Sequence, residues 1–341
     1  MAIEIIATGR AIPPKRLTND DLADRLDTSD EWIRSHTGIG ARHMVDEGVV
    51  TSDLALEAAR NALAMAAERM GVSGEALAQS LDVIVLGTTT PDYYGVPATA
   101  CIVQNKLGAR NAAAMDVTAA CTGFIYGLET AAGLLTLNRS RKRALVIGAE
   151  VLSRLIDWND RGTAVLFGDG AGAVLIERTE ASGDGRVRRG LLRTVLEADG
   201  SGAESLMIRR GGGRYPYREG EAAESPRVEM DGRLVYNFAV KALTGTVEKL
   251  LAAEGLAIDD VARIIPHQAN ARIIQAAGKR LGIPESKFFL NIEEYANTSA
   301  ASIPIALDEL NRAGELKPGD LIMTIGFGGG LTYGGNLIIW Q

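Results

Sequence analysis

The sequence predicts a layered α/β fold, because short apolar runs alternate along the chain with longer amphipathic segments. The runs are rich in Val, Ile and Leu and only a few residues long, which is typical of buried strands. Strands are expected at residues 83–86, 144–147, 173–176, 263–265, 321–325 and 337–339. Helical periodicity lies between them, for example over residues 52–70 and 237–254.

The composition is that of a globular chain with a large buried core: 341 residues, 46% of them hydrophobic and 23% charged. The net charge of −7 disfavours nucleic acid as the main partner. No signal peptide is recognised, and no stretch of about 18 uncharged apolar residues is expected to span a membrane. Two cysteines, Cys101 and Cys121, are too few for a disulfide framework, so we expect a reducing, cytoplasmic location and a free thiol.

A polar segment rich in glycine and proline, residues 211–227, is expected to be a surface loop. It divides the chain into two halves of comparable size. No internal repeat is visible at the level of residue identity.

The strongest candidate for chemistry is the segment DVTAACTGF, in which a strand-like run leads through small residues into a helix. Gly123, Gly127 and Ala131 give this helix a face of small side chains, so it can approach a neighbour closely. A cysteine at a helix start lies at the positive end of the helix dipole, which favours the thiolate. Cys121 is therefore the candidate nucleophile, although an inert buried thiol is the commoner explanation for a single cysteine.

Two further polar residues could serve that nucleophile. His267 follows the predicted strand at 263–265, a position where α/β folds place working groups. A single histidine at a strand end is nevertheless more often a hydrogen-bonding residue than a catalyst. Asn297 belongs to the polar run NTSAAS, where helix capping is the better explanation from the residues alone. The helix after His267 is expected to have one apolar face and an opposite face that carries Arg272 and Lys279.

Several other kinds of site are disfavoured. The glycine runs at 168–172 and 326–330 lead into strands rather than helices, whereas a dinucleotide site needs a helix N-terminus after its glycines. The two cysteines and three histidines are not spaced as zinc ligands. We expect neither a bound metal nor a nucleotide cofactor.

Four motifs in order, DVTAACTGF, IIPHQANARII, ANTSAASIPIAL and GFGGGLTYG, together resemble the β-ketoacyl-acyl-carrier-protein synthase III family of thiolase-fold condensing enzymes. The resemblance spans nearly the whole chain. It implies a five-layered αβαβα fold of two pseudo-duplicated halves that works as a homodimer. Residues 1–180 would form the half with the nucleophilic cysteine, and residues 181–341 the half with the histidine and asparagine.

The resemblance also implies catalytic roles. Cys121, His267 and Asn297 would form the catalytic triad, and the backbone N–H groups of Cys121 and Gly329 an oxyanion hole. Cys121 would accept the acyl group of an acyl-CoA, and His267 and Asn297 would stabilise the enolate formed when malonyl-acyl-carrier protein loses carbon dioxide. This is the initiating condensation of type II fatty-acid synthesis, and it needs no cofactor beyond the coenzyme A thioester that is its substrate.

Binding residues are implied in the same way. Trp32 would stack on the adenine of coenzyme A, with Arg161, Asn270 and Arg272 also at this site. His36 stands where many family members have an arginine beside the nucleotide, which should weaken or change that contact. Ordinary packing would equally explain Trp32.

The remaining implied contacts concern the carrier protein and the acyl chain. Arg272, Lys279 and Arg280 would dock the acidic carrier, although a solvated helix face is the usual role of such residues. Val96 stands where acetyl-selective members have a phenylalanine that closes the acyl pocket across the dimer. Because valine is smaller, we expect primers longer than acetyl to be tolerated.

Two other functions remain open at this stage. The first is a specialised priming or acyl-transfer condensing enzyme of a polyketide or quinolone-type pathway. The second is a non-catalytic acyl- or carrier-binding homologue, which would have no need of all three residues Cys121, His267 and Asn297.

Overall fold

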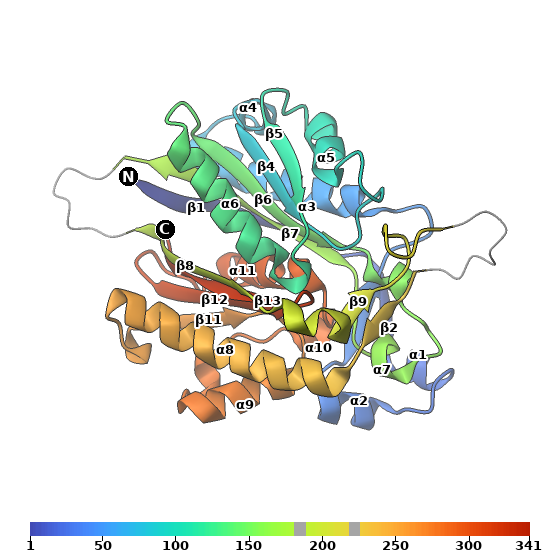
Figure 1. Cartoon of the computed structure of the whole chain (residues 1–341). Coiled ribbons are helices and arrows are strands. Elements are labelled where there is room, and N and C mark those ends of the chain that lie inside the picture. The colour runs from blue at the N-terminus through green and yellow to red at the C-terminus, as the bar shows by residue number, and fades with distance from the viewer. Residues whose placement is uncertain (181–188, 218–225) are drawn as a thin grey trace.

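The computed structural model describes residues 1–180, 189–217 and 226–341, and its main feature is a pair of sheets with helices between and outside them (Figure 1). The first sheet has the order β1-β7-β6-β4-β5. Its strands are β1 (Ala2–Ala11), β4 (Val83–Gly87), β5 (Ala113–Val117), β6 (Arg143–Glu150) and β7 (Gly170–Thr179). Strand β4 is parallel to β5 and β6, whereas β7 is antiparallel to β6 and β1.

The second sheet has the order β11-β12-β13-β8. Its strands are β8 (Gly190–Ala198), β11 (Arg263–Pro266), β12 (Leu321–Gly328) and β13 (Thr332–Ile339). Strand β11 is parallel to β12, and the other pairs are antiparallel. Both sheets are therefore mixed, and all strands of one come before all strands of the other along the chain.

Six longer helices complete five layers. They are α3 (Thr51–Met70), α5 (Thr99–Leu107), α6 (Gly123–Leu137), α8 (Gly232–Glu254), α9 (Ala271–Leu281) and α11 (Ser302–Arg312). Helices α3 and α5 cover the outer face of the first sheet, α6 and α11 lie between the sheets, and α8 and α9 cover the second sheet (Figure 1). The predicted layered α/β fold is confirmed.

Smaller elements lie around these layers, and most of them are at the lower right of Figure 1. The short helices are α1 (Asn19–Ala23), α2 (Asp30–Thr37), α4 (Gly74–Gln79), α7 (Arg161–Ala164) and α10 (Ile292–Tyr295). Two-stranded sheets pair β2 (Lys15–Thr18) with β3 (Ala41–Met44), and β9 (Leu206–Ile208) with β10 (Val228–Met230). The 3-10 turns are η1 (Ala120–Thr122), η2 (Leu152–Leu155), η3 (Gly200–Ser205), η4 (Ile258–Asp260), η5 (Glu285–Lys287) and η6 (Ser299–Ala301).

Glycine allows the central layer to approach the first sheet. A Cβ added to Gly87 in β4 would lie 2.5 Å from the backbone carbon of Gly123 in α6. A Cβ on Gly148 in β6 would lie 2.1 Å from the carbonyl oxygen of Ala300 in η6. Contacts this short cannot accommodate a side chain. The predicted close approach of the helix after Cys121 is thus confirmed, and η6 approaches the same sheet.

The expected strands are all present, and both expected helices are found with shifted N-termini. Helix α8 begins at Gly232, before the predicted residue 237, because the Asp231 carboxylate caps it by accepting the N–H groups of Arg233 and Leu234. Strand β1 was not predicted, since Glu4 interrupts its apolar run. Glu4 is nevertheless buried, and it accepts a hydrogen bond from the Thr179 hydroxyl.

Other boundaries are tested only in part. Of the predicted loop at 211–227, residues 211–217 contain no helix or strand, and 218–225 lie outside the described residues. The proposed boundary between residues 180 and 181 adjoins the undescribed residues 181–188, so it stays a prediction.

One helix bears on the expectation that no segment spans a membrane. Residues Ala120–Leu137 form a stretch that is long and apolar enough to span a membrane by length and composition, the only such helix among the described residues. The inward-facing residues of α6, such as Phe124, Ile125 and Leu128, are buried between the two sheets. This stretch is therefore a core helix.

Candidate active site

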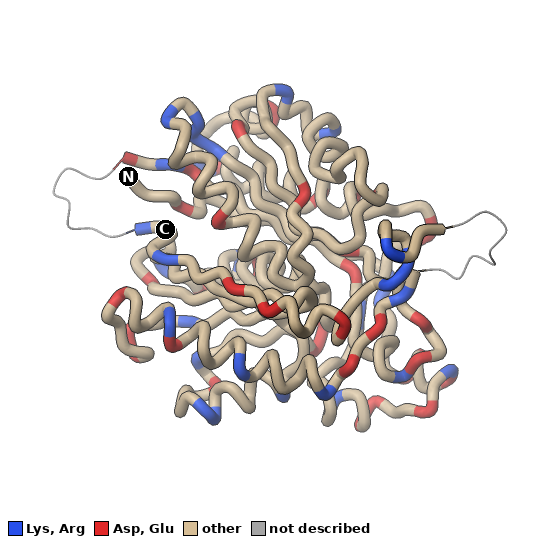
Figure 2. Tube along the Cα trace, in the orientation of Figure 1, with Lys and Arg blue, Asp and Glu red and all other residues tan. Residues whose placement is uncertain are grey.

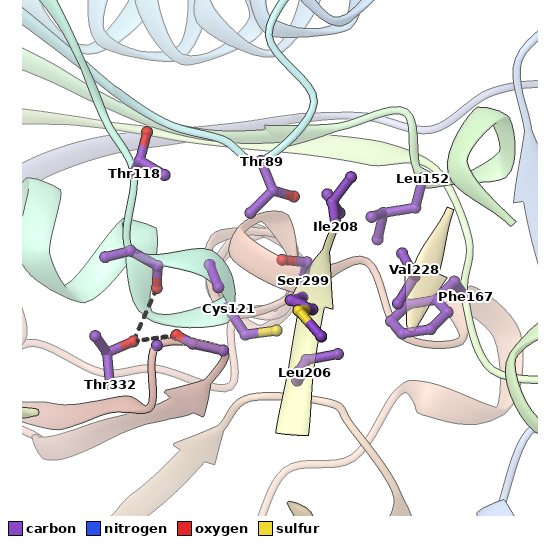
Figure 3. Close-up of a pocket in the computed structure, with 15 residues that line it drawn as sticks. Thr89, Thr118, Cys121, Leu152, Phe167, Leu206, Ile208, Val228, Ser299 and Thr332 are labelled. Atoms are coloured by element: carbon purple, nitrogen blue, oxygen red, sulfur yellow. Dashed lines mark hydrogen bonds between the residues drawn. The ribbon is translucent and has the colours of Figure 1, made fainter. Parts of the chain in front are cut away.

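Two cavities meet at Cys121. The apolar cavity, of about 340 Å³, has walls from Leu152, Phe167, Leu206, Met207, Ile208 and Val228, with Thr89, Cys121, Ser299 and Gly329 at its polar end (Figure 3). The entrance cavity, of about 240 Å³, is lined by Trp32, His36, Arg161, Asn270, His267, Asn297 and Gly328 among others. Cys121, Phe167 and Leu206 line both cavities, so the thiol lies at their junction.

Cys121 occupies a constrained turn at the start of α6. The preceding residue, Ala120, has φ of 45°, a left-handed conformation that costs a residue with a side chain about 1–3 kcal/mol. Gly328, at the end of β12, passes so close that an added Cβ would lie 2.8 Å from the Cβ of Cys121. The turn and the glycine together fix the thiol against the second sheet.

Burial dominates the electrostatics of this thiol. It raises the pKa of Cys121 to about 12, although hydrogen bonds from Ser299 and from the backbone N–H groups of Cys121 and Gly329 act in the opposite direction. The expectation that the helix start favours the thiolate is therefore corrected, because the sequence did not reveal how completely the thiol is desolvated. The two N–H groups are those that the resemblance assigned to an oxyanion hole, and that role stays a prediction.

The Thr332 hydroxyl contacts both segments that carry these two N–H groups. Its hydroxyl lies 3.1 Å from the carbonyl oxygen of Ala119 and 3.0 Å from that of Gly329 (Figure 3). Because Ala119 precedes the cysteine turn and Gly329 belongs to the loop after β12, this hydroxyl fixes the spacing of segments from the two halves of the chain.

His267 is buried and uncharged. Burial lowers its pKa to about 3. Its Nδ1 lies 2.7 Å from the Ser302 hydroxyl, and that oxygen also accepts the N–H of Gln268 at 3.4 Å. A hydroxyl that accepts from Gln268 can donate to Nδ1, which leaves the imidazole proton on Nε2. The arrangement favours a neutral imidazole that donates from Nε2.

Asn297 is held so that its amide N–H groups remain available. Its Oδ1 accepts the backbone N–H of Ser299 at 2.9 Å, so its Nδ2 is left to donate. Its backbone N–H donates to the Leu166 carbonyl, and its own carbonyl accepts the N–H of Gly168. The predicted helix cap is not its role, since the amide oxygen serves a tight turn in which Ser299 has φ of 48°.

The lining of the entrance cavity includes four of the residues expected to bind coenzyme A: Trp32, His36, Arg161 and Asn270. The guanidinium of Arg161 lies 4.8 Å from the centre of the Trp32 ring, and the His36 ring stacks on the same ring at 4.3 Å. Asn270 caps α9 through Oδ1 and donates from Nδ2 to the carbonyl of His36. An adenine between Trp32 and Arg161 would require these two side chains to separate.

The other predicted binding residues lie outside both cavities. Arg272, Lys279 and Arg280 are exposed on α9, whose basic residues appear at the bottom of Figure 2. Val96 is 83% exposed and does not line the apolar cavity of its own chain. Its predicted place in an acyl pocket thus requires a second copy of the chain.

Sequence reasoning missed three polar residues behind the site. Ser299 and Ser302 lie within the recognised motif ANTSAAS, but no sequence pattern distinguishes them from serines that commonly occur at helix starts. Glu150 ends β6 and is completely buried. No group of three or more metal-ligating side chains occurs in the described ranges.

Comparison with known proteins identifies the family. Sequence models of the 3-oxoacyl-[acyl-carrier-protein (ACP)] synthase III family match residues 115–200, and of its C-terminal part residues 251–340. The β-ketoacyl-[acyl-carrier-protein] synthase III of Clostridium acetobutylicum is 45% identical over 340 residues, or 99% of either chain. The chain belongs to this family. It is therefore an acyltransferase, a thiolase-like condensing enzyme that initiates fatty-acid synthesis.

Solved structures agree with this assignment. The 3-oxoacyl-[acyl-carrier-protein] synthase III of Aquifex aeolicus has a TM-score of 0.88 at 41% identity, covering 99% of this chain and 100% of that one. The priming β-ketosynthase of the R1128 polyketide pathway has a TM-score of 0.87 at 30% identity, covering 100% and 96%. The thiolase-like fold is confirmed, and α6 is a buried helix of a soluble enzyme.

Proposed function

We propose that this enzyme condenses an acyl-CoA primer with malonyl-acyl-carrier protein, releasing coenzyme A and carbon dioxide. The observation that carries the proposal is the junction of two cavities at Cys121, with His267 and Asn297 beside it on the entrance side. A thioester arriving through the entrance would meet the thiol, and its acyl chain would continue into the apolar cavity.

The first step is acyl transfer. The Cys121 sulfur attacks the thioester carbonyl, and the oxyanion that develops is stabilised by the backbone N–H groups of Cys121 and Gly329. The tetrahedral intermediate collapses, coenzyme A leaves with the thiol proton, and the acyl group remains on the sulfur. Support comes from the backbone N–H groups of Cys121 and Gly329, both of which lower the pKa of the thiol.

The second step is decarboxylative condensation. Loss of carbon dioxide from the malonyl thioester leaves an enolate, whose oxygen requires two hydrogen-bond donors. Nε2 of His267 and Nδ2 of Asn297 supply them, because Ser302 and Ser299 occupy the other polar atom of each side chain. The carbanion then attacks the acyl group on Cys121 and gives a 3-ketoacyl product on the carrier protein.

The enzyme tolerates primers longer than acetyl and works as a homodimer in the cytoplasm. The apolar cavity is walled mainly by aliphatic side chains. Val96 from the second copy would close it, and valine leaves more room than phenylalanine. A Val96→Phe variant should keep acetyl transfer but lose octanoyl transfer; unchanged octanoyl transfer would contradict this assignment.

A role in fatty-acid synthesis is favoured over a polyketide priming role by relative similarity. The Clostridium enzyme is 45% identical, whereas the R1128 priming enzyme is 30% identical. Both functions would use the same three catalytic residues.

The decisive experiment follows the mass of the intact protein. Incubation with acetyl-, butyryl-, hexanoyl- and octanoyl-CoA should add one acyl group to the wild-type protein and none to Cys121→Ala. Addition of malonyl-acyl-carrier protein should remove the acyl group and release carbon dioxide. Equal acylation of Cys121→Ala would exclude Cys121 as the nucleophile, and acylation without carbon dioxide release would indicate a plain acyltransferase.

A further inference from the structure

Glu150 is a fully buried carboxyl group directly behind the catalytic turn. It ends β6, and hydroxyl and backbone donors surround its two oxygens. Oε2 lies 2.7 Å from the Thr90 hydroxyl, 2.9 Å from the Thr89 hydroxyl and 3.0 Å from the Thr89 backbone nitrogen. Oε1 lies 3.0 Å from the Ser299 hydroxyl. A carboxyl group so placed is expensive to bury unless it is fully hydrogen-bonded.

Ser299 connects this carboxyl group to two residues of the proposed mechanism. Its backbone N–H donates to Oδ1 of Asn297, and its hydroxyl lines the same cavity as the Cys121 thiol, whose pKa it lowers. Its left-handed φ of 48° is an unfavourable conformation for serine, so the turn needs other contacts to persist. The hydrogen bond to Glu150 is one such contact, and the close packing of Ala300 on Gly148 is another.

We propose that Glu150 is a positioning residue for the condensation, holding Ser299 in the conformation that aims the Asn297 amide and orients the hydroxyl beside Cys121. The inference rests on the proposed function. An ionised carboxylate can only accept, so Glu150 and the Cys121 sulfur compete for the single proton of the Ser299 hydroxyl. The carboxylate thereby affects which way the hydroxyl beside the nucleophile is turned.

The charge has a second effect on the thiol. Burial raises the pKa of Glu150, and every group that lowers it is a hydroxyl or a backbone N–H. Its negative charge in turn raises the pKa of Cys121. Glu150 is the charged group that raises the pKa of the thiol, whereas His267, which lines the entrance cavity with Cys121 and has a pKa of about 3, is neutral near pH 7.

The test is Glu150→Gln, which keeps the shape but removes the charge and places an N–H₂ group among donors. If the amide nitrogen faces Ser299, the hydroxyl must turn toward the sulfur. We expect malonyl-dependent kcat to fall about tenfold or more, the size expected for a misdirected donor. Alkylation of Cys121 by iodoacetamide should move to lower pH, becoming up to about tenfold faster at a fixed pH below its midpoint.

A matched control separates this effect from loss of stability. Asp308→Asn removes another fully buried carboxylate. Asp308 lies in α11 and accepts a hydrogen bond from the Thr8 hydroxyl of β1. It should lower the melting temperature without moving the alkylation profile. Ser299→Ala keeps the backbone N–H but removes the link, so adding Glu150→Gln to it should change condensation by less than about twofold.

Each outcome has a distinct meaning. A wild-type protein that forms the acyl-enzyme but releases no carbon dioxide would contradict the proposed function and leave the alkylation profile as the test of Glu150. A competent wild-type enzyme whose Glu150→Gln variant keeps both kcat and the alkylation profile would overturn the inference. If Glu150→Gln fails to fold, Ser299→Ala must reproduce the selective loss of condensation, or the inference is wrong.

Discussion

The two ends of the entrance cavity differ in how their side chains are held. At the inner end, Cys121, His267 and Asn297 are buried, uncharged and fixed by hydrogen bonds to neighbouring residues. At the mouth, Trp32 and Arg161 hold each other through one stacking contact at the surface. The inner end is fixed by hydrogen bonds within the protein, whereas in the proposed binding mode Trp32 and Arg161 would have to separate to admit the adenine.

This difference separates two kinds of kinetic effect. Preorganised donors act on charge that develops during reaction, so their loss lowers kcat. Exposed stacking and charged groups contribute to binding in both ground and transition states, so their loss raises KM. Substitutions at the two ends should therefore fall into different classes.

The largest effect is expected from His267→Ala and Asn297→Ala. Each should reduce malonyl-dependent carbon dioxide release about 10²- to 10³-fold, because one of two donors to the enolate is lost. Formation of the acyl-enzyme should change much less, since the oxyanion hole and Cys121 remain. Radiometric carbon dioxide release and intact-protein mass measure the two steps; equal loss of both would argue against separate donor roles.

Acid should destabilise the folded protein through His267. Its folded pKa of about 3 lies below its ordinary 6.5, so the unfolded state binds the proton more readily and stability falls as pH drops through 6.5 toward 3. At pH 5.5 the loss relative to pH 7.5 is about 1.4 kcal/mol. Urea denaturation of wild type and His267→Asn at both values should differ by this amount; identical pH dependence would show that His267 is not buried in its neutral form.

At the mouth, Trp32→Ala should raise KM for acyl-CoA about three- to tenfold and leave kcat nearly unchanged. The reason is loss of a stacking surface worth about 0.5–1.5 kcal/mol. Steady-state kinetics with a saturating second substrate would measure it. Trp158→Ala offers a control, because this tryptophan donates to the Ser153 carbonyl and lines neither cavity. A fall in kcat with unchanged KM for Trp32→Ala would contradict the expectation that the mouth contributes to binding and the inner end to kcat.

The smallest effect is expected on α9. Reversing charge in Lys279→Glu/Arg280→Glu should raise KM for malonyl-acyl-carrier protein a few-fold at low salt and less at high salt, since exposed charges are screened. Acylation by acyl-CoA should be unaffected. A pair of reversals on the far surface, Arg60→Glu/Arg69→Glu, controls for net charge. If both pairs weaken the carrier protein equally, α9 is not its docking surface.

Sequence patterns predicted where two residues of the inner end lie. Cys121 is at the start of α6 and His267 directly follows β11, because a small-residue helix start and a strand end are local patterns. Asn297 came from the family resemblance, and the catalytic roles of all three stay predictions. Glu150 could not be found, since its role depends on β6 meeting η6 across 149 residues of chain. The direct stacking of Arg161 on Trp32 is likewise a contact between distant segments, and the high pKa of Cys121 reflects burial that no local pattern reveals.

The hydrogen bonds between Asn297 and residues 166–168 bear on the order in which the site can form during synthesis of the chain. The cysteine segment emerges first, but the asparagine that serves it is made some 176 residues later and is held by a segment beside the first sheet. A nascent or truncated first half would therefore carry the thiol without the groups that use its acyl ester. If His267 and Asn297 have the proposed roles, catalysis requires that the last third of the chain has been synthesised and has folded against the first.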